Sequence, residues 1–127
     1  MKILLVEDNL LNQKVVLFNL KKYNYKISAV TNGLDAIKAV KNEQFDLVLM
    51  DLMLPEMNGY ETTYEIREYE KQTGAEKPLP IIALTANTFD DDRNKCLDAG
   101  MNEYISKPFN AIQLIEKIEK FIQPVLK

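Results

Sequence analysis

Five short apolar runs are spread along the chain, and each is followed by a longer segment with helical character. The runs are continuous rather than alternating, which is typical of strands covered on both faces in a parallel sheet. Strands that alternate with helices indicate βαβ units with right-handed connections. The predicted strands are ILLV (3–6), YKISAV (25–30), FDLVLM (45–50), IIALT (81–85) and EYIS (103–106). We therefore expect an α/β fold with a five-stranded parallel sheet and helices on both faces.

The intervening helices are marked by capping and breaking residues. Asn9 is a candidate cap for the first helix, and an acidic first turn and Gly100 bound the fourth. The first helix is apolar over much of its circumference, so the sequence does not show which of its faces is buried. The last helix carries an apolar stripe at helical spacing, formed by Ile112, Ile115, Ile118 and Ile122. The predicted helices span 10–23, 34–43, 60–74, 90–100 and 110–123.

The composition fits one ordinary globular domain over residues 1–127, with 46% apolar and 28% charged residues. The formal net charge of −3 argues against nucleic acid as a direct partner, because phosphate binding needs clustered lysines and arginines. No apolar run approaches the length of a membrane span, and acids follow the first residues too soon for a signal peptide. A single cysteine, Cys96, excludes an internal disulfide and favours a cytoplasmic location.

Charged and hydroxyl side chains follow four of the predicted strands at the points where those strands end. Glu7 and Asp8 follow the first strand, and Asp51 ends the third. Thr85 ends the fourth strand, and Lys107 follows the fifth. In an open parallel sheet the functional crevice lies outside the carboxyl ends of the strands. We therefore expect these five side chains to meet at one edge of the sheet.

Three carboxylates at one edge need compensation. Two carboxylates about 4 Å apart repel by roughly 4 kcal/mol at an effective dielectric constant of 20. Lys107 alone cannot neutralise three of them, so either their pKa values rise or a cation binds. A set of oxygen ligands without histidine or cysteine suits Mg²⁺. Together with a lysine, a hydroxyl and an aspartate, the ion would complete a site suited to phosphoryl transfer, with the aspartate as nucleophile.

The motifs ILLVEDN, LVLMDLMLPEMNGYE, PIIALTAN and AGMNEYISKPF, in this order and spacing, resemble the receiver domain of two-component response regulators. The resemblance covers essentially the whole chain. It implies a flavodoxin-like (βα)5 doubly wound sheet with strand order 2-1-3-4-5. The details DN…NQ, ALTAN and AGMNEY are most similar to receivers of hybrid sensor histidine kinases.

The resemblance also implies roles for particular residues. Asp51 matches the phosphoacceptor, and Glu7 and Asp8 match the acidic pair that holds Mg²⁺, Asp8 directly and Glu7 through water. Glu7 stands where an aspartate is common. Met53 matches the position that offers its backbone carbonyl to the metal, so its side chain need not be polar.

Four further positions complete the match. Thr85 matches the switch hydroxyl that hydrogen-bonds the phosphoryl group, and Lys107 matches the lysine that pairs with a phosphoryl oxygen. Pro108 is expected to be cis. Tyr104 matches the aromatic residue that swings inward on activation, although an aromatic residue on a strand is more often part of the core.

The function implied is that of a phosphoacceptor in a phosphorelay. Asp51 would take a phosphoryl group from a histidine kinase or a histidine phosphotransfer protein, with Mg²⁺ as cofactor, and the surface would then change for partner binding. The chain would catalyse its own phosphorylation and dephosphorylation rather than act as a stand-alone enzyme. It contains no histidine, so it cannot be the histidine half of such a relay. We expect a monomer or a weak dimer linked to phosphorylation, free-standing or part of a hybrid kinase.

Several alternatives stay open at the level of sequence. Asp51 could cap the next helix, the acidic pair could be a solvated loop, and Thr85 and Lys107 could be ordinary strand and surface residues. An aspartyl-nucleophile phosphatase usually needs a second acid where Met53 stands. A flavodoxin-like electron carrier would need a phosphate-binding loop after the first strand. Here that segment begins with Glu7 and Asp8, which would repel phosphate. A receiver-shaped interaction module that is never phosphorylated is the remaining rival.

Overall fold

The computed structural model describes residues 1–74, 77–85, 90–107 and 109–122, with the backbone alone for 90–93. Its strands are β1 (Lys2–Val6), β2 (Lys26–Val30), β3 (Leu47–Asp51), β4 (Ile81–Thr85) and β5 (Glu103–Ser106). Its helices are α1 (Leu10–Leu20), α2 (Gly33–Asn42), α3 (Gly59–Thr73), α4 (Asp90–Asp98) and α5 (Ala111–Glu119).

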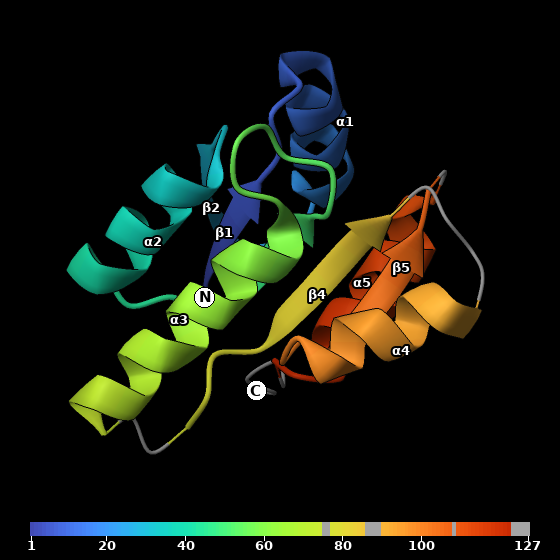
Figure 1. The fold of residues 1–127 in the computed structure, drawn as a ribbon. Helices are drawn as coiled ribbons and strands as arrows, with labels where there is room; N and C mark the ends of the chain where they lie inside the picture. Colours follow the sequence, from blue (N-terminus) through green and yellow to red (C-terminus); the bar gives the residue numbers. More distant parts are fainter. Residues whose placement is uncertain (75–76, 86–89, 108, 123–127) are drawn as a thin grey trace.

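The five strands form one parallel sheet in the order β2-β1-β3-β4-β5. Helices α1 and α5 lie on one face of the sheet, and α2, α3 and α4 lie on the other (Figure 1). The predicted fold class, the strand order and the placement of helices on both faces are therefore confirmed. Among the described residues, no helix combines the length and the apolar character needed to cross a membrane.

The three central strands explain why the apolar runs are continuous. In β1, Ile3 and Leu5 pack toward α1 and α5, whereas Leu4 and Val6 pack toward the other helices. Every residue of β3 and β4 is buried in the same way. Because side chains alternate between the faces of a strand, a strand with helices on both sides needs apolar residues at every position.

Asparagines begin four of the helices. The side chains of Asn9, Asn32, Asn58 and Asn110 each accept a hydrogen bond from the backbone N–H three residues later. The predicted Asn9 cap is confirmed. An Asn-Gly pair is often the signal of a turn, but Asn32-Gly33 and Asn58-Gly59 are each an N-cap followed by the first residue of a helix. Such caps satisfy backbone donors that have no partner inside the helix.

The predicted apolar stripe of the last helix is partly wrong. Ile115, Ile118 and Ile122 are buried, but Ile112 is 67% exposed and Leu114 is fully buried. The first and last helices also end earlier than predicted, at Leu20 and Glu119. The buried side of α5 passes through Leu114, so Ile112 in the first turn lies to one side of it.

A small ionic cluster ties α5 to the edge strand β5. The Glu103 carboxylate lies 3.3 Å from the Lys117 ammonium and 3.2 Å from that of Lys120. Burial of the Glu103 side chain raises its pKa, but hydrogen bonds from the Tyr104 N–H and from both lysines outweigh it, so the net pKa is lowered. The cluster therefore favours the ionised carboxylate at neutral pH.

Candidate functional site: an acidic cluster at the carboxyl edge of the sheet

The carboxyl ends of β1 and β3 bring three acids together. The two strands are neighbours, with Val6 opposite Met50, so the residues that follow lie side by side. One carboxylate oxygen from each of Glu7, Asp8 and Asp51 lies within 4.8 Å of the others. The structure thus places the three acids as the strand-end argument requires.

One lysine serves this cluster. The Lys107 ammonium lies 3.2 Å from a Glu7 oxygen and 3.5 Å from an Asp51 oxygen. The ion pairs among the described residues do not include Asp8, which is exposed. Three carboxylates and one ammonium leave a formal charge of −2 if all are ionised. The site therefore retains negative charge that a cation can offset.

Burial makes this charge expensive. Glu7 and Asp51 are only 1% and 4% exposed. Burial raises the pKa of the Glu7 carboxyl, and its hydrogen bond with Asp51 and repulsion by that residue raise the pKa further. Lys107 and the Asn9 N–H lower the pKa but do not cancel the rise. Glu7 is thus held so that either a proton or a cation stabilises it.

Asp51 is fixed at the end of a rigid strand. One carboxylate oxygen accepts a hydrogen bond of 3.0 Å from the Met53 N–H, and the other faces Lys107. The cap of α3 is Asn58, so the reading of Asp51 as a helix cap is wrong. Asp51 is a buried carboxylate whose oxygens are held by one N–H and one ammonium.

Thr85 and Lys107 reach the same edge from the other side. Thr85 ends β4, is 3% exposed and lies opposite Ser106 of β5. Its carbonyl oxygen accepts a 2.6 Å hydrogen bond from the Lys107 N–H. The backbone of Lys107 is therefore tied to Thr85 while its side chain spans to Glu7 and Asp51.

The remaining predicted residues are placed less directly. Met53 is 76% exposed, and the use of its backbone carbonyl by a metal stays a prediction. Tyr104 is half-buried and packs against the core on the side of α2, α3 and α4. Its movement on activation also stays a prediction. Pro108 lies outside the described residues.

Two residues near the site were missed by sequence reasoning. Gln13 is buried in α1 and donates to the carbonyl oxygen of Glu7 at 2.8 Å. Gly59 begins α3, and a Cβ at this position would lie 2.6 Å from the carbonyl oxygen of Asp51. In the sequence, the Asn58-Gly59 pair is the only feature that draws attention to Gly59. Such a pair is typical of a turn and does not indicate a close approach to the end of β3.

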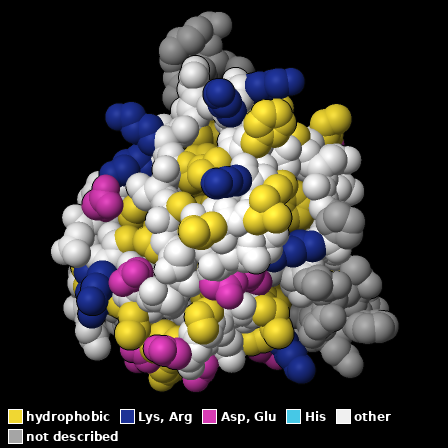
Figure 2. All heavy atoms as spheres, turned by 90° about the horizontal axis from the view of Figure 1, so that it is seen from above, with side chains coloured by type: hydrophobic (Ala, Val, Ile, Leu, Met, Phe, Trp, Pro, Cys, Tyr) yellow, Lys and Arg dark blue, Asp and Glu magenta, His cyan; other side chains and the backbone are white. Residues whose placement is uncertain are grey.

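The cluster lies between two hollows. One, of about 330 Å³, includes Glu7, Lys107, Val15 and Phe109. The other, of about 440 Å³, lies over Asp8 and extends toward α2. Seen from above, acidic side chains gather in the lower half of this face, with hydrophobic patches at its centre (Figure 2). A partner approaching this face would meet charge and apolar surface together.

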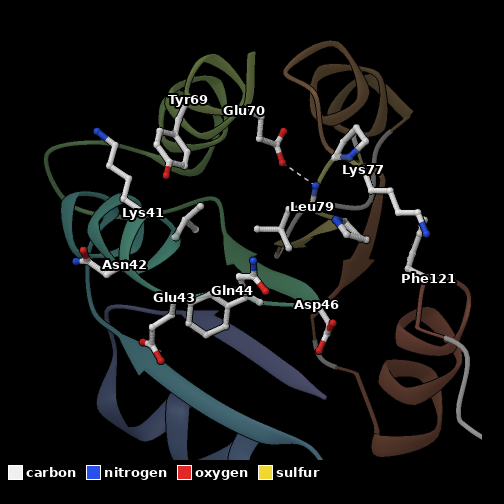
Figure 3. Close-up of a pocket in the computed structure, with 14 residues that line it drawn as sticks. Lys41, Asn42, Glu43, Gln44, Asp46, Tyr69, Glu70, Lys77, Leu79 and Phe121 are labelled. Carbon is white, nitrogen blue, oxygen red and sulfur yellow. Dashed lines mark hydrogen bonds between the residues drawn. The ribbon is translucent and has the colours of Figure 1, made fainter. Parts of the chain in front are cut away.

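A third hollow lies at the opposite end of the sheet. It has a volume of about 640 Å³ and includes Phe45, Tyr69 and Leu79 (Figure 3). Glu70 accepts a hydrogen bond from the Leu79 N–H at its wall. Strands of five residues span about 16 Å. This hollow is separated by that length from the acidic cluster, and we assign it no part in the chemistry of the cluster.

The model of the response regulator receiver domain matches residues 3–119. The chain belongs to the receiver domain family of two-component and phosphorelay signalling. This membership agrees with the acidic cluster, Thr85 and Lys107 at one edge, and it separates the receiver domain from the phosphatase and electron-carrier alternatives.

Related sequences are found in long signalling proteins. Hybrid signal transduction histidine kinase B of Dictyostelium discoideum is 43% identical over an alignment that covers 91% of this chain and 6% of that protein. Probable histidine kinase 1 of Oryza sativa subsp. indica is 37% identical, with 97% of this chain and 16% of that protein covered. The receiver domain thus spans a small part of these relatives. Its similarity to receivers of hybrid kinases, predicted from the motifs, is confirmed.

Solved structures share the fold closely. The receiver domain of sensor histidine kinase PA1611 from Pseudomonas aeruginosa PAO1 has a TM-score of 0.85 and 41% identity, with 97% of this chain and 98% of that chain covered. It was crystallised with a magnesium ion coordinated in its active-site cleft. The receiver domain of Saccharomyces cerevisiae Ssk1, in complex with the histidine phosphotransfer protein Ypd1, has a TM-score of 0.90 and 35% identity, covering 95% of this chain and 88% of that chain.

Proposed function

We propose that this receiver domain accepts a phosphoryl group on Asp51 from a phosphohistidine of a histidine kinase or a phosphotransfer protein, and that Mg²⁺ is its cofactor. The observation that carries the proposal is the Asp51 carboxylate, buried at the end of β3 and surrounded by Glu7, Asp8 and Lys107. Within residues 1–127 the chain would act as a single receiver unit.

The residues present fit a magnesium ion. Their donors are carboxylate oxygens, which Mg²⁺ prefers, and the cluster has a formal charge of −2 after Lys107 is counted. Asp8 and Asp51 would hold the ion directly, Glu7 through water and Met53 through its carbonyl oxygen. When bound, the ion supplies charge stabilisation to phosphoryl oxygens. The magnesium in the Pseudomonas aeruginosa relative supports this choice.

The chain's own residues position and stabilise the transfer. An Asp51 carboxylate oxygen forms a bond to phosphorus, the bond from phosphorus to the donor imidazole nitrogen breaks, and the imidazole leaves with that electron pair. The Met53 N–H keeps the other Asp51 oxygen in place. Lys107 exchanges its contact with the carboxylate for one with the transferring oxygens. Water later attacks the same phosphorus, the bond from phosphorus to the Asp51 oxygen breaks, and inorganic phosphate leaves while the Asp51 carboxylate is regenerated.

The phosphoryl group would be read out through Thr85 and Tyr104. The Thr85 hydroxyl closes on the new acyl phosphate, and the Tyr104 ring moves into the space that it leaves. Both residues belong to neighbouring strands, since Ala83 of β4 lies opposite Tyr104. The surface of β4, α4, β5 and α5 would shift between two arrangements, because phosphorylation favours one of them. A weak dimer of phosphorylated domains is one such use.

The donor would dock against α1. Its side chains at Leu10, Leu11, Val15 and Phe18 are between 50% and 77% exposed, next to the hollow beside Glu7. Exposed apolar surface of this kind is typical of a protein contact. The relative bound to Ypd1 supports a phosphotransfer protein as partner. We place the exchange in the cytoplasm.

The phosphorylation site is tested with a small donor. The parent, Asp51→Asn and Glu65→Gln would each be incubated with acetyl phosphate and Mg²⁺ and examined by intact-protein mass spectrometry. Glu65 is an exposed acid of α3 outside the cluster and serves as the matched control. We expect one phosphoryl group on the parent and on Glu65→Gln, its loss in EDTA, and none on Asp51→Asn. Equal labelling of Asp51→Asn would refute the proposal.

A further inference from the structure

Gln13 is the one buried amide of α1, and its surroundings are unusual for a glutamine on a helix. It is 8% exposed, whereas its neighbours Asn12 and Lys14 are exposed. Its Nε2 atom donates to the carbonyl oxygen of Glu7 at 2.8 Å and to that of Val30 at 3.1 Å. Both carbonyl oxygens are acceptors, so the NH₂ group of the Gln13 amide, and not its oxygen, must face them.

These two bonds join the ends of β1 and β2. The Val30 carbonyl also accepts a 3.0 Å hydrogen bond from the Glu7 N–H, which continues the sheet by one residue. The Glu7 carbonyl lies past that last bond, where the chain leaves the sheet. Gln13 therefore supplies a partner to a carbonyl group that the sheet no longer holds.

The Glu7 carbonyl belongs to the peptide group that carries the Asp8 N–H. Because a peptide group is planar, fixing the direction of this carbonyl fixes the plane from which Asp8 departs. The carboxylates of Glu7 and Asp51 are each held by a backbone N–H and by Lys107. Among the described residues, the Asp8 side chain takes part in no hydrogen bond or ion pair, so the direction of its carboxylate depends on its backbone.

We propose that Gln13 is a positioning residue for the divalent-cation site: its amide holds the peptide between Glu7 and Asp8 and so aims the Asp8 carboxylate at the ion. The inference rests on the proposed function, because it takes Asp8 as a direct ligand. Partners that orient metal ligands commonly contribute ten- to one-hundredfold to metal affinity. Gln13 acts through the backbone of a ligand, so we expect about the lower figure, tenfold.

The test replaces Gln13 by methionine, which has a similar length and helix propensity but no amide. Gln113→Met is the matched control, because Gln113 is also near the start of a helix and its side chain bonds a backbone group, the Asn110 N–H. Gln13→Leu is a second variant in case methionine does not fold. Circular dichroism establishes that each variant is folded and gives the midpoint of its thermal unfolding. Mg²⁺ binding is then measured by calorimetry at a temperature well below that midpoint.

We expect the Mg²⁺ dissociation constant to rise about tenfold in Gln13→Met and Gln13→Leu and to stay unchanged in Gln113→Met. The Mg²⁺ concentration for half-maximal labelling by acetyl phosphate should rise by the same factor, while the rate at saturating Mg²⁺ stays within about twofold. If the Gln13 variants had an unchanged Mg²⁺ affinity and a lower midpoint of thermal unfolding, the inference would be overturned, since Gln13 would then stabilise the fold only. If the parent itself binds no Mg²⁺, the proposed function fails instead, and the inference falls with it.

Discussion

Removal of the Asp8 charge should stabilise the protein in the absence of metal. The Asp8 and Asp51 oxygens lie within 4.8 Å, which gives a repulsion of about 0.9 kcal/mol at the dielectric constant of water and about 3.5 kcal/mol at 20. Because Asp8 is exposed, the smaller figure is the better guide. We expect Asp8→Asn to raise the free energy of unfolding by about 1 kcal/mol in EDTA.

Magnesium should reverse this order. At a Mg²⁺ concentration ten times the dissociation constant, linkage adds about 1.4 kcal/mol to the stability of the parent. Asp8→Asn lacks one ligand and one negative charge, so it should gain much less. The variant that is more stable in EDTA should therefore become the less stable of the two in Mg²⁺.

Thermal unfolding with and without Mg²⁺ measures both effects, and a difference of 1 kcal/mol corresponds to about 4 °C for a domain of this size. Glu65→Gln removes the same charge from an exposed position outside the cluster and should change neither the order nor the response to Mg²⁺. The reasoning would be refuted if Asp8→Asn were less stable than the parent in EDTA, or if Mg²⁺ raised both midpoints equally.

Three further predictions concern residues around the site and the edge strand. Thr63→Val should raise the free energy of unfolding by about 1 kcal/mol, because the buried Thr63 hydroxyl has no hydrogen-bond partner among the described residues. Thr62→Val should lower the free energy of unfolding by about 1 kcal/mol, since the Thr62 hydroxyl donates to the carbonyl oxygen of the N-cap residue Asn58 at 2.9 Å. Gly59→Ala should cost about 1–3 kcal/mol and slow labelling by acetyl phosphate, because the added Cβ presses on the end of β3; a variant as stable and as active as the parent would contradict this. Glu103→Gln should lower stability by about 0.5–1 kcal/mol at neutral pH. The pKa of Glu103 is lower in the folded protein than in the unfolded chain, so its ionised carboxylate stabilises the fold at pH values above the unfolded-state pKa. This contribution is lost as the pH falls through the folded-state pKa. Urea unfolding at neutral and strongly acidic pH should show the Glu103→Gln difference shrinking on acidification, and a constant difference would count against the ionic cluster.

Glu7 gives the pH dependence of the metal site its sign. The pKa of Glu7 is raised in the folded protein, so the native state holds a proton more readily than the unfolded state does. Without metal, this residue makes stability fall as the pH rises from the unfolded pKa through the folded one. Protonation of Glu7 removes charge from the cluster, so Mg²⁺ affinity should weaken on acidification over the same window, as calorimetry at several pH values would show.

The sheet was predictable because its central strands obey a strong constraint. Strands covered by helices on both faces are apolar at each position, so IIALT could be bounded to the residue. The site followed from topology, since parallel strands end at one edge and the polar residues after ILLV and LVLM must meet there. No side-chain geometry was needed for that step.

The errors lie where tertiary packing decides between similar patterns. Ile112 and Leu114 are both apolar residues in the first turns of α5, and only the approach of the helix to the sheet exposes one and buries the other. Gln13 is a polar residue of a helix that is apolar over much of its circumference, and nothing in the neighbouring sequence shows that its side chain faces two carbonyl groups. Gly59 is likewise important because it lies against the carbonyl oxygen of Asp51. The two residues are separated along the chain, so the sequence alone does not show this contact.

The central claim is that Asp51 receives phosphorus at a site where Glu7, Asp8 and Lys107 already converge. A crystal structure grown with Mg²⁺ and beryllium fluoride, which mimics an aspartyl phosphate, tests it most directly. We expect the fluoride group bonded to an Asp51 oxygen and contacted by Thr85 and Lys107, with the ion at the acidic pair. Density for both ligands elsewhere, or for neither under saturating conditions, would contradict the account.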